Sequence, residues 1–319
     1  MGEGWGEGSG GGRCEAGWNG VAARLCYRAP VRLRTLPWRA LMPAASLLLR
    51  AGQGLQRFLL FRIGWGVFRP RADDIYIATY PKSGTTLLQM MLYQLTTDGG
   101  MGFPHINAVC PWIEMEIFKR NAASLETFPS PRCFKTHLFH RQLPRRGRFI
   151  YIVRDVRDVV VSAFHNARRL GKDTSLERFT AEFLESGWGA SGTWFAHLRS
   201  WWPHRHDGDV LFLSYEEVIA DLEGTVRRVA AFCGIPLREE EMPRILERCS
   251  LAFMKRHEEK LDNRFHDVRP GYGGFIRRGE ATAGRELDPG QRALLERKLS
   301  ELAAELGCAR GDPYRELLA

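Results

Sequence analysis

The stretch IYIATYPKSGTTLLQMMLYQL, residues 75–95, decides the fold of this chain. Its first five residues are mostly apolar and β-branched, and they predict a buried strand over 75–79. A loop of small and polar residues follows over 80–86, and the leucines and methionines of 87–95 predict a buried helix. This order brings backbone N–H groups and the positive end of a helix dipole to one point. The stretch therefore predicts a site for an anion.

The loop differs from the nucleoside-triphosphate motif G-x-x-x-x-G-K-[ST], because Lys82 precedes Gly84 and the first glycine is absent. Lys82 supplies a mobile cation, and Gly84 allows close approach of the backbone. Further donors are the hydroxyls of Ser83, Thr85 and Thr86. The alternative is a solvated lysine in an ordinary turn. Polar residues at the carboxyl end of a buried strand favour a ligand over that alternative.

Strands and helices alternate through the rest of the chain. Further strands are predicted over 132–137, 148–153 and 209–214. Helices are predicted over 156–170, 174–183, 190–202, 221–233, 238–248 and 289–306. This alternation predicts an α/β fold of three layers, in which a mainly parallel sheet has helices on both faces. The loop after the first strand makes the fold P-loop-like.

The basic charge is concentrated in an N-terminal extension. Residues 1–20 are Gly-rich and are expected to be disordered, and residues 72–310 are expected to form one domain. Between them, residues 21–71 contain ten arginines and no acidic residue, out of a net charge of +9 for the whole chain. The folded body is thus nearly neutral, which argues against nucleic acid as a partner.

The extension contains apolar runs that are interrupted by arginines. In residues 41–68, Arg50, Arg57 and Arg62 divide the apolar residues, which argues against a helix that spans a membrane. A basic amphipathic helix on an anionic membrane surface fits this composition. A helix or arm that packs on the domain fits it as well, and both alternatives stay open. The expected location is the cytoplasm, and contact with a membrane surface is left open.

Polar side chains that can donate a hydrogen bond to an anion follow all four predicted strands. They are Lys82, Lys135 with His137, Arg154, and Tyr215. Because the carboxyl ends of parallel strands share one edge, we expect these groups to converge on a polyanionic ligand. Ser162 lies two helical turns beyond Arg154 and could hydrogen-bond to the same ligand.

His137 is the candidate general base, since a neutral imidazole can accept a proton near pH 7. A lone histidine is more often structural, but His137 follows a strand-end lysine on the expected ligand edge. Arg277 and Arg278 precede Gly279 in a Gly-rich loop. Paired arginines can bind a phosphate with two hydrogen bonds each. The seven cysteines are scattered, which indicates reduced thiols and no zinc site.

Taken together, the motifs resemble those of the sulfotransferases that use 3′-phosphoadenosine 5′-phosphosulfate (PAPS), in their cytosolic-type branch. The matching motifs are TYPKSGTT (79–86), FKTHL (134–138), YIVRDVRDVVVSAFH (151–165), the strand end at 215–217, CSLAFM (249–254) and FIRRG (275–279). They cover about residues 72–285 in the order of the family. The resemblance implies the sulfotransferase fold and transfer of a sulfonate group from PAPS to a hydroxyl acceptor, with no metal.

The resemblance also implies a role for each matching residue. Lys82, Ser83, Gly84, Thr85 and Thr86 resemble the loop that binds the 5′-phosphosulfate. Lys135 resembles the lysine at the transferring sulfonate, and His137 resembles the base that deprotonates the acceptor. The remaining cofactor residues implied are Arg154 and Ser162 at the 3′-phosphate, Arg277, Arg278 and Gly279 beside them, and Tyr215 near the adenine.

The chain departs from the family at several positions. The aromatic residues that usually stack on the adenine are replaced by Leu87 and Leu251, and the usual Gly-Asp-Trp after the arginine motif is replaced by Gly284, Arg285 and Glu286. The C-terminal dimer motif is absent, so the sequence predicts no oligomeric state. The alternatives are a P-loop, kinase-like phosphoryl transferase and a non-catalytic relative that binds a nucleotide or lipid. The acceptor is expected to be a small molecule or a lipid with a hydroxyl group.

Overall fold

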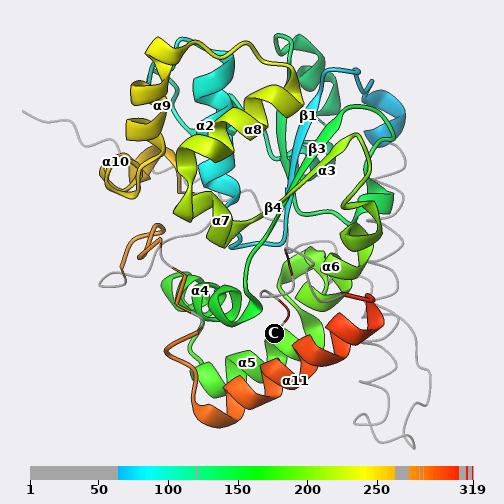
Figure 1. The fold of residues 1–319 in the computed structure, drawn as a ribbon, viewed down its shortest axis with the longest axis vertical. Helices are drawn as coiled ribbons and strands as arrows, with labels where there is room; N and C mark the ends of the chain where they lie inside the picture. Colours follow the sequence, from blue (N-terminus) through cyan, green and yellow to red (C-terminus); the bar gives the residue numbers. More distant parts are fainter. Residues whose placement is uncertain are drawn as a thin grey trace, which may run out of the picture. The chain divides into compact units, whose positions relative to one another are not determined.

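A four-stranded parallel sheet forms the centre of the fold (Figure 1). This computed structural model describes residues 64–119, 121–262, 273–279, 281, 282, 284–308, 314 and 318. The strand order is β2-β1-β3-β4, and each neighbouring pair is parallel. The strands are β1 (Ile75–Thr79), β2 (Cys133–Thr136), β3 (Arg148–Val153) and β4 (Val210–Ser214). The predicted α/β class with a parallel sheet is confirmed, whereas most of the N-terminal extension lies outside the described residues.

Helices cover both faces of the sheet, because successive strand side chains point to opposite faces. Ile75 and Ile77 belong to one hydrophobic cluster, and Tyr76 and Ala78 belong to the other. The first cluster packs against α2 (Thr85–Thr96), α7 (Tyr215–Ala220), α8 (Leu222–Cys233), α9 (Met242–Cys249) and α10 (Leu251–Arg256). The second packs against α3 (Ile113–Phe118), α4 (Val156–Arg169), α5 (Leu176–Ser186), α6 (Trp194–Trp201) and α11 (Pro289–Glu305).

Side chains at the starts of the helices explain where they begin. Asp155 caps α4 by accepting a hydrogen bond from the backbone N–H of Arg157 (2.7 Å). Ser214 and Glu217 form a reciprocal capping box at the start of α7, directly after β4. Short 3₁₀ helices connect the longer elements at Ile106–Ala108, Ala122–Thr127, His140–Gln142, Gly189–Ser191, Trp202–His204, Glu239–Glu241 and Glu258–Lys260. α4 and α7 thus each begin at a residue whose side chain accepts a hydrogen bond from one of the first free N–H groups, whereas Gly84 provides no such cap at the start of α2.

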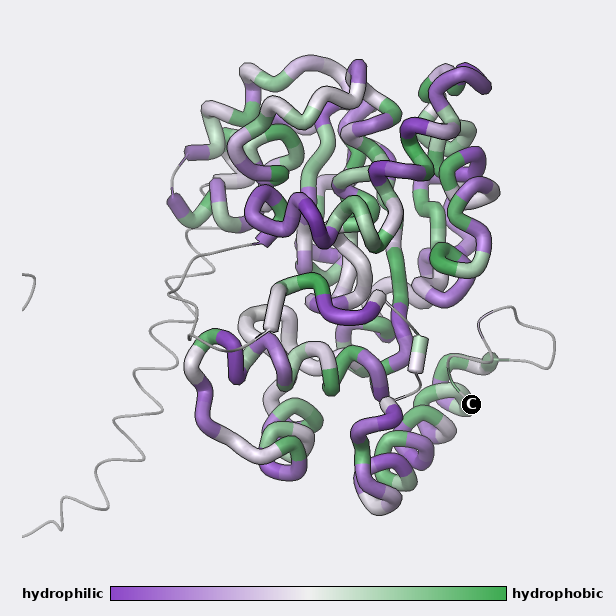
Figure 2. Tube along the Cα trace, turned by 90° about the vertical axis from the view of Figure 1, so that its left-hand side faces the viewer, coloured by the Kyte–Doolittle hydropathy of each residue, from purple (hydrophilic) through white to green (hydrophobic). Residues whose placement is uncertain are grey.

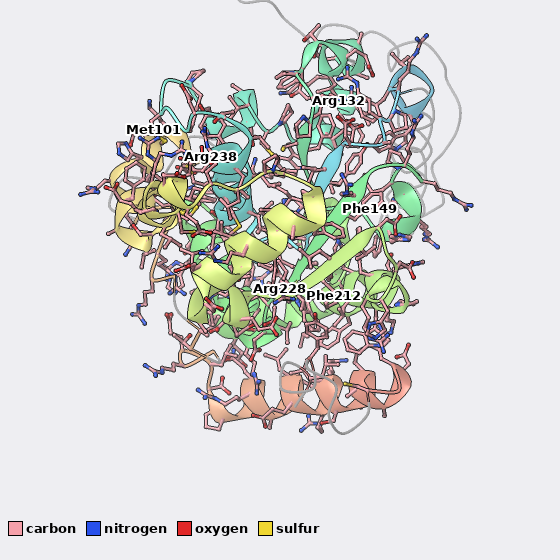
Figure 3. All side chains as sticks on the ribbon, turned by 45° about the horizontal axis from the view of Figure 1, so that its top comes forward. Met101, Arg132, Phe149, Phe212, Arg228 and Arg238 are labelled. Atoms are coloured by element: carbon pink, nitrogen blue, oxygen red, sulfur yellow. The ribbon has the colours of Figure 1, made fainter. Side chains whose placement is uncertain are left out.

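The buried positions follow helical and strand spacing. Leu295, Leu299 and Leu302 of α11 are buried at intervals of three and four residues, and hydrophobic and hydrophilic residues alternate along the helices in Figure 2. Phe149 and Phe212 come from adjacent strands and belong to the same cluster (Figure 3). This pattern fixes the side of the sheet on which each helix lies.

Two predicted elements differ from the structure. The helix predicted over 190–202 begins at Trp194, because Gly192 has a φ of 65° and Thr193 caps the helix by accepting from the N–H of Ala196. The predicted helix over 238–248 is a 3₁₀ turn followed by α9. In addition, Tyr215 begins a helix of its own, α7, which the sequence reasoning did not predict.

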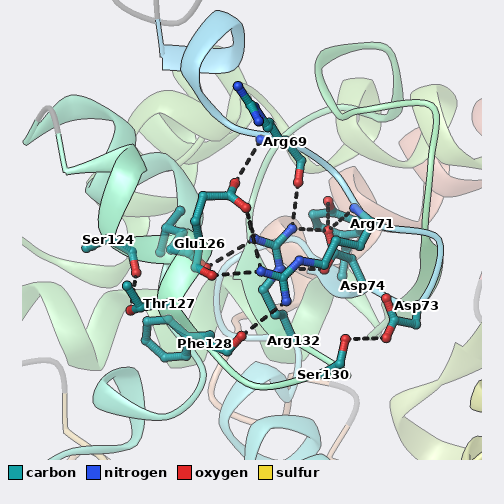
Figure 4. A network of polar contacts seen from close by, with 12 residues as sticks. Arg69, Arg71, Asp73, Asp74, Ser124, Glu126, Thr127, Phe128, Ser130 and Arg132 are labelled. Carbon is teal, nitrogen blue, oxygen red and sulfur yellow. Dashed lines mark hydrogen bonds and ion pairs between the residues drawn. The ribbon is translucent and has the colours of Figure 1, made fainter.

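A buried ion network joins the amino ends of β1 and β2 (Figure 4). The fully buried guanidinium of Arg132 binds the carboxylate of Asp74 with two hydrogen bonds of 2.7 Å. It also donates to the carbonyls of Leu125 (3.1 Å) and Arg69 (2.7 Å), and it lies 3.1 Å from Glu126. Because both charges are paired and hydrogen-bonded, neither is left uncompensated in the interior. The parallel pairing of β1 with β2 sets the register of the two strands, in which Ile77 of β1 lies opposite Lys135 of β2.

Candidate active site

The loop after β1 has a backbone that suits an anion. Lys82 has a φ of 74° and Gly84 a φ of 100°, so the chain turns sharply between β1 and α2. A Cβ atom at Gly84 would lie 2.8 Å from the ring of Tyr215, which only glycine avoids. The hydroxyl of Ser83 is buried and has no hydrogen-bond partner among the described residues. An unpaired buried donor at a helix N-terminus is what an oxyanion ligand would satisfy.

His137 is fixed against the end of β1. Its Nδ1 lies 2.9 Å from the carbonyl oxygen of Thr79 and 3.2 Å from the hydroxyl of the same residue. The Thr79 hydroxyl lies 2.6 Å from the hydroxyl of Thr85, which begins α2 beside Thr86. A carbonyl oxygen can only accept, so Nδ1 carries the hydrogen and Nε2 is left as the acceptor of a proton. Burial, and then the charge of Lys135, lowers the pKa of His137 to about 3 and keeps the ring neutral.

Two side chains that the sequence reasoning gave no role support His137 and Lys135. The buried carboxylate of Glu114 accepts a hydrogen bond of 2.6 Å from the backbone N–H of His137, and burial raises its pKa. The ring of Trp112 meets the His137 ring edge to face, with centroids 5.2 Å apart. The Nζ atom of Lys135 lies 4.5 Å from the centroid of Trp112. The backbone of Trp112 also forms an isolated parallel β-bridge with Lys135, which extends the sheet at its β2 edge.

The two lysines lose part of their usual affinity for a proton. Burial, followed by the charges of Arg169 and Arg154, lowers the pKa of Lys82 to about 7. Burial lowers the pKa of Lys135 to about 8. The lowered pKa values show that the protein only partly stabilises the charged forms of these lysines. An anionic ligand would stabilise the charged forms further, so the site favours such a ligand.

Arg154 and Tyr215 lie beside the loop, as the strand-end argument predicted. The Arg154 guanidinium lies over the Tyr215 ring, 4.3 Å from its centroid, and donates to the carbonyl oxygen of Lys82 (3.3 Å). Its Nη2 atom is 3.9 Å from a carboxylate oxygen of Asp158. Ser162 lies two helical turns further along α4 and is partly exposed. The structure therefore brings three of the predicted groups, Lys82, Arg154 and Tyr215, into one place.

The arginine motif at 277–279 occupies the neighbouring segment. Arg277 is paired with Glu286 (2.7 Å), whereas Arg278 is exposed. Gly279 has a φ of 66°, and a Cβ atom there would lie 2.7 Å from Leu251, which is 38% exposed. Leu251 thus lies against this glycine at the position where an aromatic residue was expected to stack on the adenine.

The comparison with known proteins decides the family. A family model described as a sulfotransferase domain matches residues 72–293. The chain belongs to the sulfotransferase family. The predicted membership of this family is confirmed, and with it the assignment of the chain as an enzyme.

Known sulfotransferases are similar to this chain over more than half of its length. The chain is 31% identical to the amine sulfotransferase of Oryctolagus cuniculus over 229 residues, 66% of this chain and 74% of that protein. It is 34% identical to sulfotransferase 4A1 of Mus musculus over 194 residues, 57% of this chain and 67% of that protein. The crystal structure of mouse sulfotransferase SULT7A1 complexed with PAP is also similar. Its sequence is 27% identical to that of this chain, and the two structures have a TM-score of 0.63 over 81% of this chain and 92% of that one.

The sulfotransferase also contains a buried ion pair that sequence reasoning missed. Arg169, at the end of α4, binds the carboxylate of Asp262 with two hydrogen bonds (2.8 and 2.6 Å). Its guanidinium lies 5.7 Å from the ring of Phe275, and Lys82 lies 4.2 Å from the same ring. Among the described residues, no group of histidine, cysteine or acidic side chains could hold a metal, and no helix could cross a membrane.

Proposed function

We propose that His137 is the general base of this PAPS-dependent sulfotransferase and that Lys82 and Lys135 stabilise the transferring group. The observation that carries this assignment is the hydrogen bond between His137 Nδ1 and the Thr79 carbonyl (2.9 Å). It leaves Nε2 free to accept a proton at the edge of the anion loop. A hydroxyl oxygen of the acceptor attacks the sulfur, its proton passes to Nε2, and the bond between sulfur and the bridging oxygen breaks. Adenosine 3′,5′-bisphosphate leaves.

The cations act on the charge that grows during this transfer. Negative charge develops on the bridging oxygen and on the sulfonate oxygens as the sulfur–oxygen bond breaks. Lys82 and Lys135 are buried or half-buried, so their charges are weakly screened there. The 5′-phosphosulfate accepts hydrogen bonds from the backbone N–H groups of 82–86 and from the hydroxyl of Ser83, which has no partner among the described residues.

The other end of the cofactor is assigned to the strand ends of β3 and β4. Arg154 and Ser162 bind the 3′-phosphate, assisted by Arg277 and Arg278, and Gly279 allows the backbone to approach. Tyr215 lies beside the adenine. Leu87 and Leu251 give the base an aliphatic surface in place of aromatic stacking, which lowers affinity without changing which cofactor is bound.

Calorimetry of nucleotide binding tests the proposed site. We expect adenosine 3′,5′-bisphosphate to bind without added metal and ATP to bind much more weakly. Lys82→Ala should weaken binding of the bisphosphate by about 10- to 100-fold, because it removes one charge-assisted contact to the 5′-phosphate. ATP binding equal to that of the bisphosphate would contradict the assignment.

The same titration should depend on pH. In the free enzyme the pKa of Lys82 is about 7, so this group is increasingly neutral at higher pH. A bound anion favours the protonated form, and binding above pH 7 must therefore take up a proton. We expect the dissociation constant to rise with pH, by up to about tenfold per unit above pH 7. Lys82→Ala should lose this slope, and an unchanged slope in that variant would assign it to another group.

The extension over residues 21–71 is proposed to contact either an anionic membrane surface or the catalytic domain. The eight arginines and the apolar runs of residues 21–63 suit the first, since each basic residue near an anionic surface adds about 1 kcal/mol of attraction. Arg71 is bound to the domain through the carbonyl oxygens of Glu126 and Phe128. These two alternatives are distinguished by comparing flotation of the enzyme with vesicles that contain phosphatidylserine and with neutral vesicles. Selective flotation that is lost on removal of residues 1–63 supports membrane contact, and equal recovery with both vesicles supports packing.

The acceptor is proposed to be a small molecule or a lipid with a free hydroxyl group. Trp112 lies beside His137, which provides one aromatic face next to the base. A sulfonate-transfer screen with labelled PAPS over phenols, sterols, aliphatic alcohols and sugars would identify the class.

A further inference from the structure

Arg277 is paired within the protein although its motif suits a phosphate. Its Nη1 donates to Oε1 of Glu286 (2.7 Å), and Oε2 of the same carboxylate lies 2.6 Å from Nε2 of His165. The three side chains are about one third exposed, at 31%, 33% and 37%. One carboxylate therefore links a loop arginine to a histidine of α4.

This group of residues lies on the helix face that leads to Arg154. Asp158, Ser162 and His165 are spaced by four and three residues, so they share one face of α4. Asp158 is 3.9 Å from Arg154 and accepts hydrogen bonds from the backbone N–H groups of Thr282 (2.8 Å) and Gly284 (2.9 Å). Figure 1 shows the orange segment that follows residue 273 passing along α4 before α11 begins.

These contacts hold the segment around Glu286 against the place assigned to the 3′-phosphate. Asp158 connects that segment to Arg154, and Ser162 lies between Asp158 and His165 on the helix face. A phosphate bound by Arg154 and Ser162 would therefore be close to the carboxylate of Glu286. The phosphate and the carboxylate of Glu286 carry like charges and would repel each other. Both are also ligands for the guanidinium of Arg277.

We propose that Glu286 competes with the 3′-phosphate for Arg277 and so sets how strongly this enzyme selects a 3′-phosphorylated nucleotide. The inference rests on the role proposed for Arg277 in binding that phosphate. In the free enzyme Glu286 holds Arg277 in place, and His165 holds Glu286. When the cofactor binds, the guanidinium exchanges its carboxylate for the phosphate. This exchange reduces the part of the nucleotide affinity that comes from the 3′-phosphate. It leaves the contacts to the 5′-phosphate unchanged.

Two nucleotides that differ only in the 3′-phosphate separate this effect from general changes. Adenosine 3′,5′-bisphosphate and adenosine 5′-monophosphate are titrated into the full-length enzyme and into Glu286→Gln, Arg277→Gln and the double variant. Glu286→Gln should bind the bisphosphate about three- to tenfold more tightly at low salt, from the loss of the competing pair and of one repulsive charge. Its affinity for the monophosphate should change by less than about twofold.

The double variant tests the competition itself. In the Arg277→Gln background, the substitution at Glu286 should retain only the repulsive part of its effect, so the gain becomes smaller than in the wild-type background. Glu305→Gln is the matched control, because Glu305 also forms an exposed pair with an arginine, Arg199, and the substitution makes the same change in charge. It should leave both affinities unchanged.

Each alternative result has a separate meaning. If Arg277→Gln weakens binding of the bisphosphate but Glu286→Gln does not tighten it, the competition is overturned and the proposed cofactor site stands. Unchanged binding of the bisphosphate in Arg277→Gln overturns the role of Arg277 and the inference with it. Equal tightening of both nucleotides, or the same gain in Glu305→Gln, overturns the competition as well.

Discussion

His137→Gln should lower kcat by about 10²- to 10⁴-fold, the range that a positioned general base contributes. Glutamine fills a similar volume and can still hydrogen-bond to the carbonyl oxygen of Thr79, but its side chain cannot accept and hold a proton. The dissociation constant of adenosine 3′,5′-bisphosphate should stay within about twofold of the wild-type value, since the base contacts the acceptor and not the nucleotide.

Single-turnover transfer of labelled sulfonate measures this effect without the contribution of product release. His140→Gln is the matched control, because the same substitution is made at a half-buried histidine that stacks on His204 rather than on the site. That control should keep its rate. A loss of less than about tenfold in His137→Gln, with the fold intact, would mean that another group removes the proton.

The low pKa of His137 in the free enzyme is consistent with this role. Burial and the charge of Lys135 hold the pKa at about 3, so in the free enzyme the ring is neutral over the whole physiological range but has a low affinity for a proton. Bound PAPS would bring negative charge beside the ring and partly cancel Lys135. The proton affinity of the imidazole would therefore rise when the cofactor is in place.

The sequence was sufficient to place the groups that follow the strands. Parallel strands end at one edge, so Lys82, Arg154 and Tyr215 could be grouped from strand prediction alone. The structure confirms that the strands are parallel, and it shows that β1 lies between β2 and β3. The helix predicted over 190–202 began too early, because the positive φ of Gly192 could not be read from an apolar pattern.

The groups that sequence reasoning missed depend on contacts between distant positions. Arg169 and Asp262 are 93 residues apart, and His165 and Glu286 are 121 apart. No local spacing indicates such pairs, since each partner alone resembles an ordinary solvated charge. Glu114 was missed for another reason. It lies at the start of a short helix, α3, and only the fold shows that its carboxylate turns inward to the backbone of His137.

Lys135→Met should make the enzyme much slower and also more stable. The rate should fall by about 10²- to 10³-fold, as is typical when one preorganised group that stabilises transition-state charge is removed. Methionine has nearly the length of lysine and keeps a favourable contact with the Trp112 ring. The free energy of unfolding at pH 7 should rise by about 1–3 kcal/mol, because a buried charge no longer has to be desolvated.

The sign follows from the pKa in each state. The Lys135 pKa is about 8 in the folded enzyme, against a usual value of 10.5. Between these values the unfolded chain binds more protons, so the stability of the wild type increases with pH across this window. The advantage of Lys135→Met is therefore full below pH 8 and decreases towards pH 10.5.

Urea unfolding of both proteins at pH 7 and at pH 9.5 measures this difference. Lys172→Met is the matched control, because Lys172 is 47% exposed and pairs with Glu182 on the surface. The control should show no gain in stability. A Lys135→Met enzyme that is less stable at pH 7, with a similar dependence of unfolding on urea concentration, would show that Glu114 and Trp112 more than offset the cost of the buried charge. In that case Lys135 would be an ordinary structural cation, and its contribution to the rate would need another explanation.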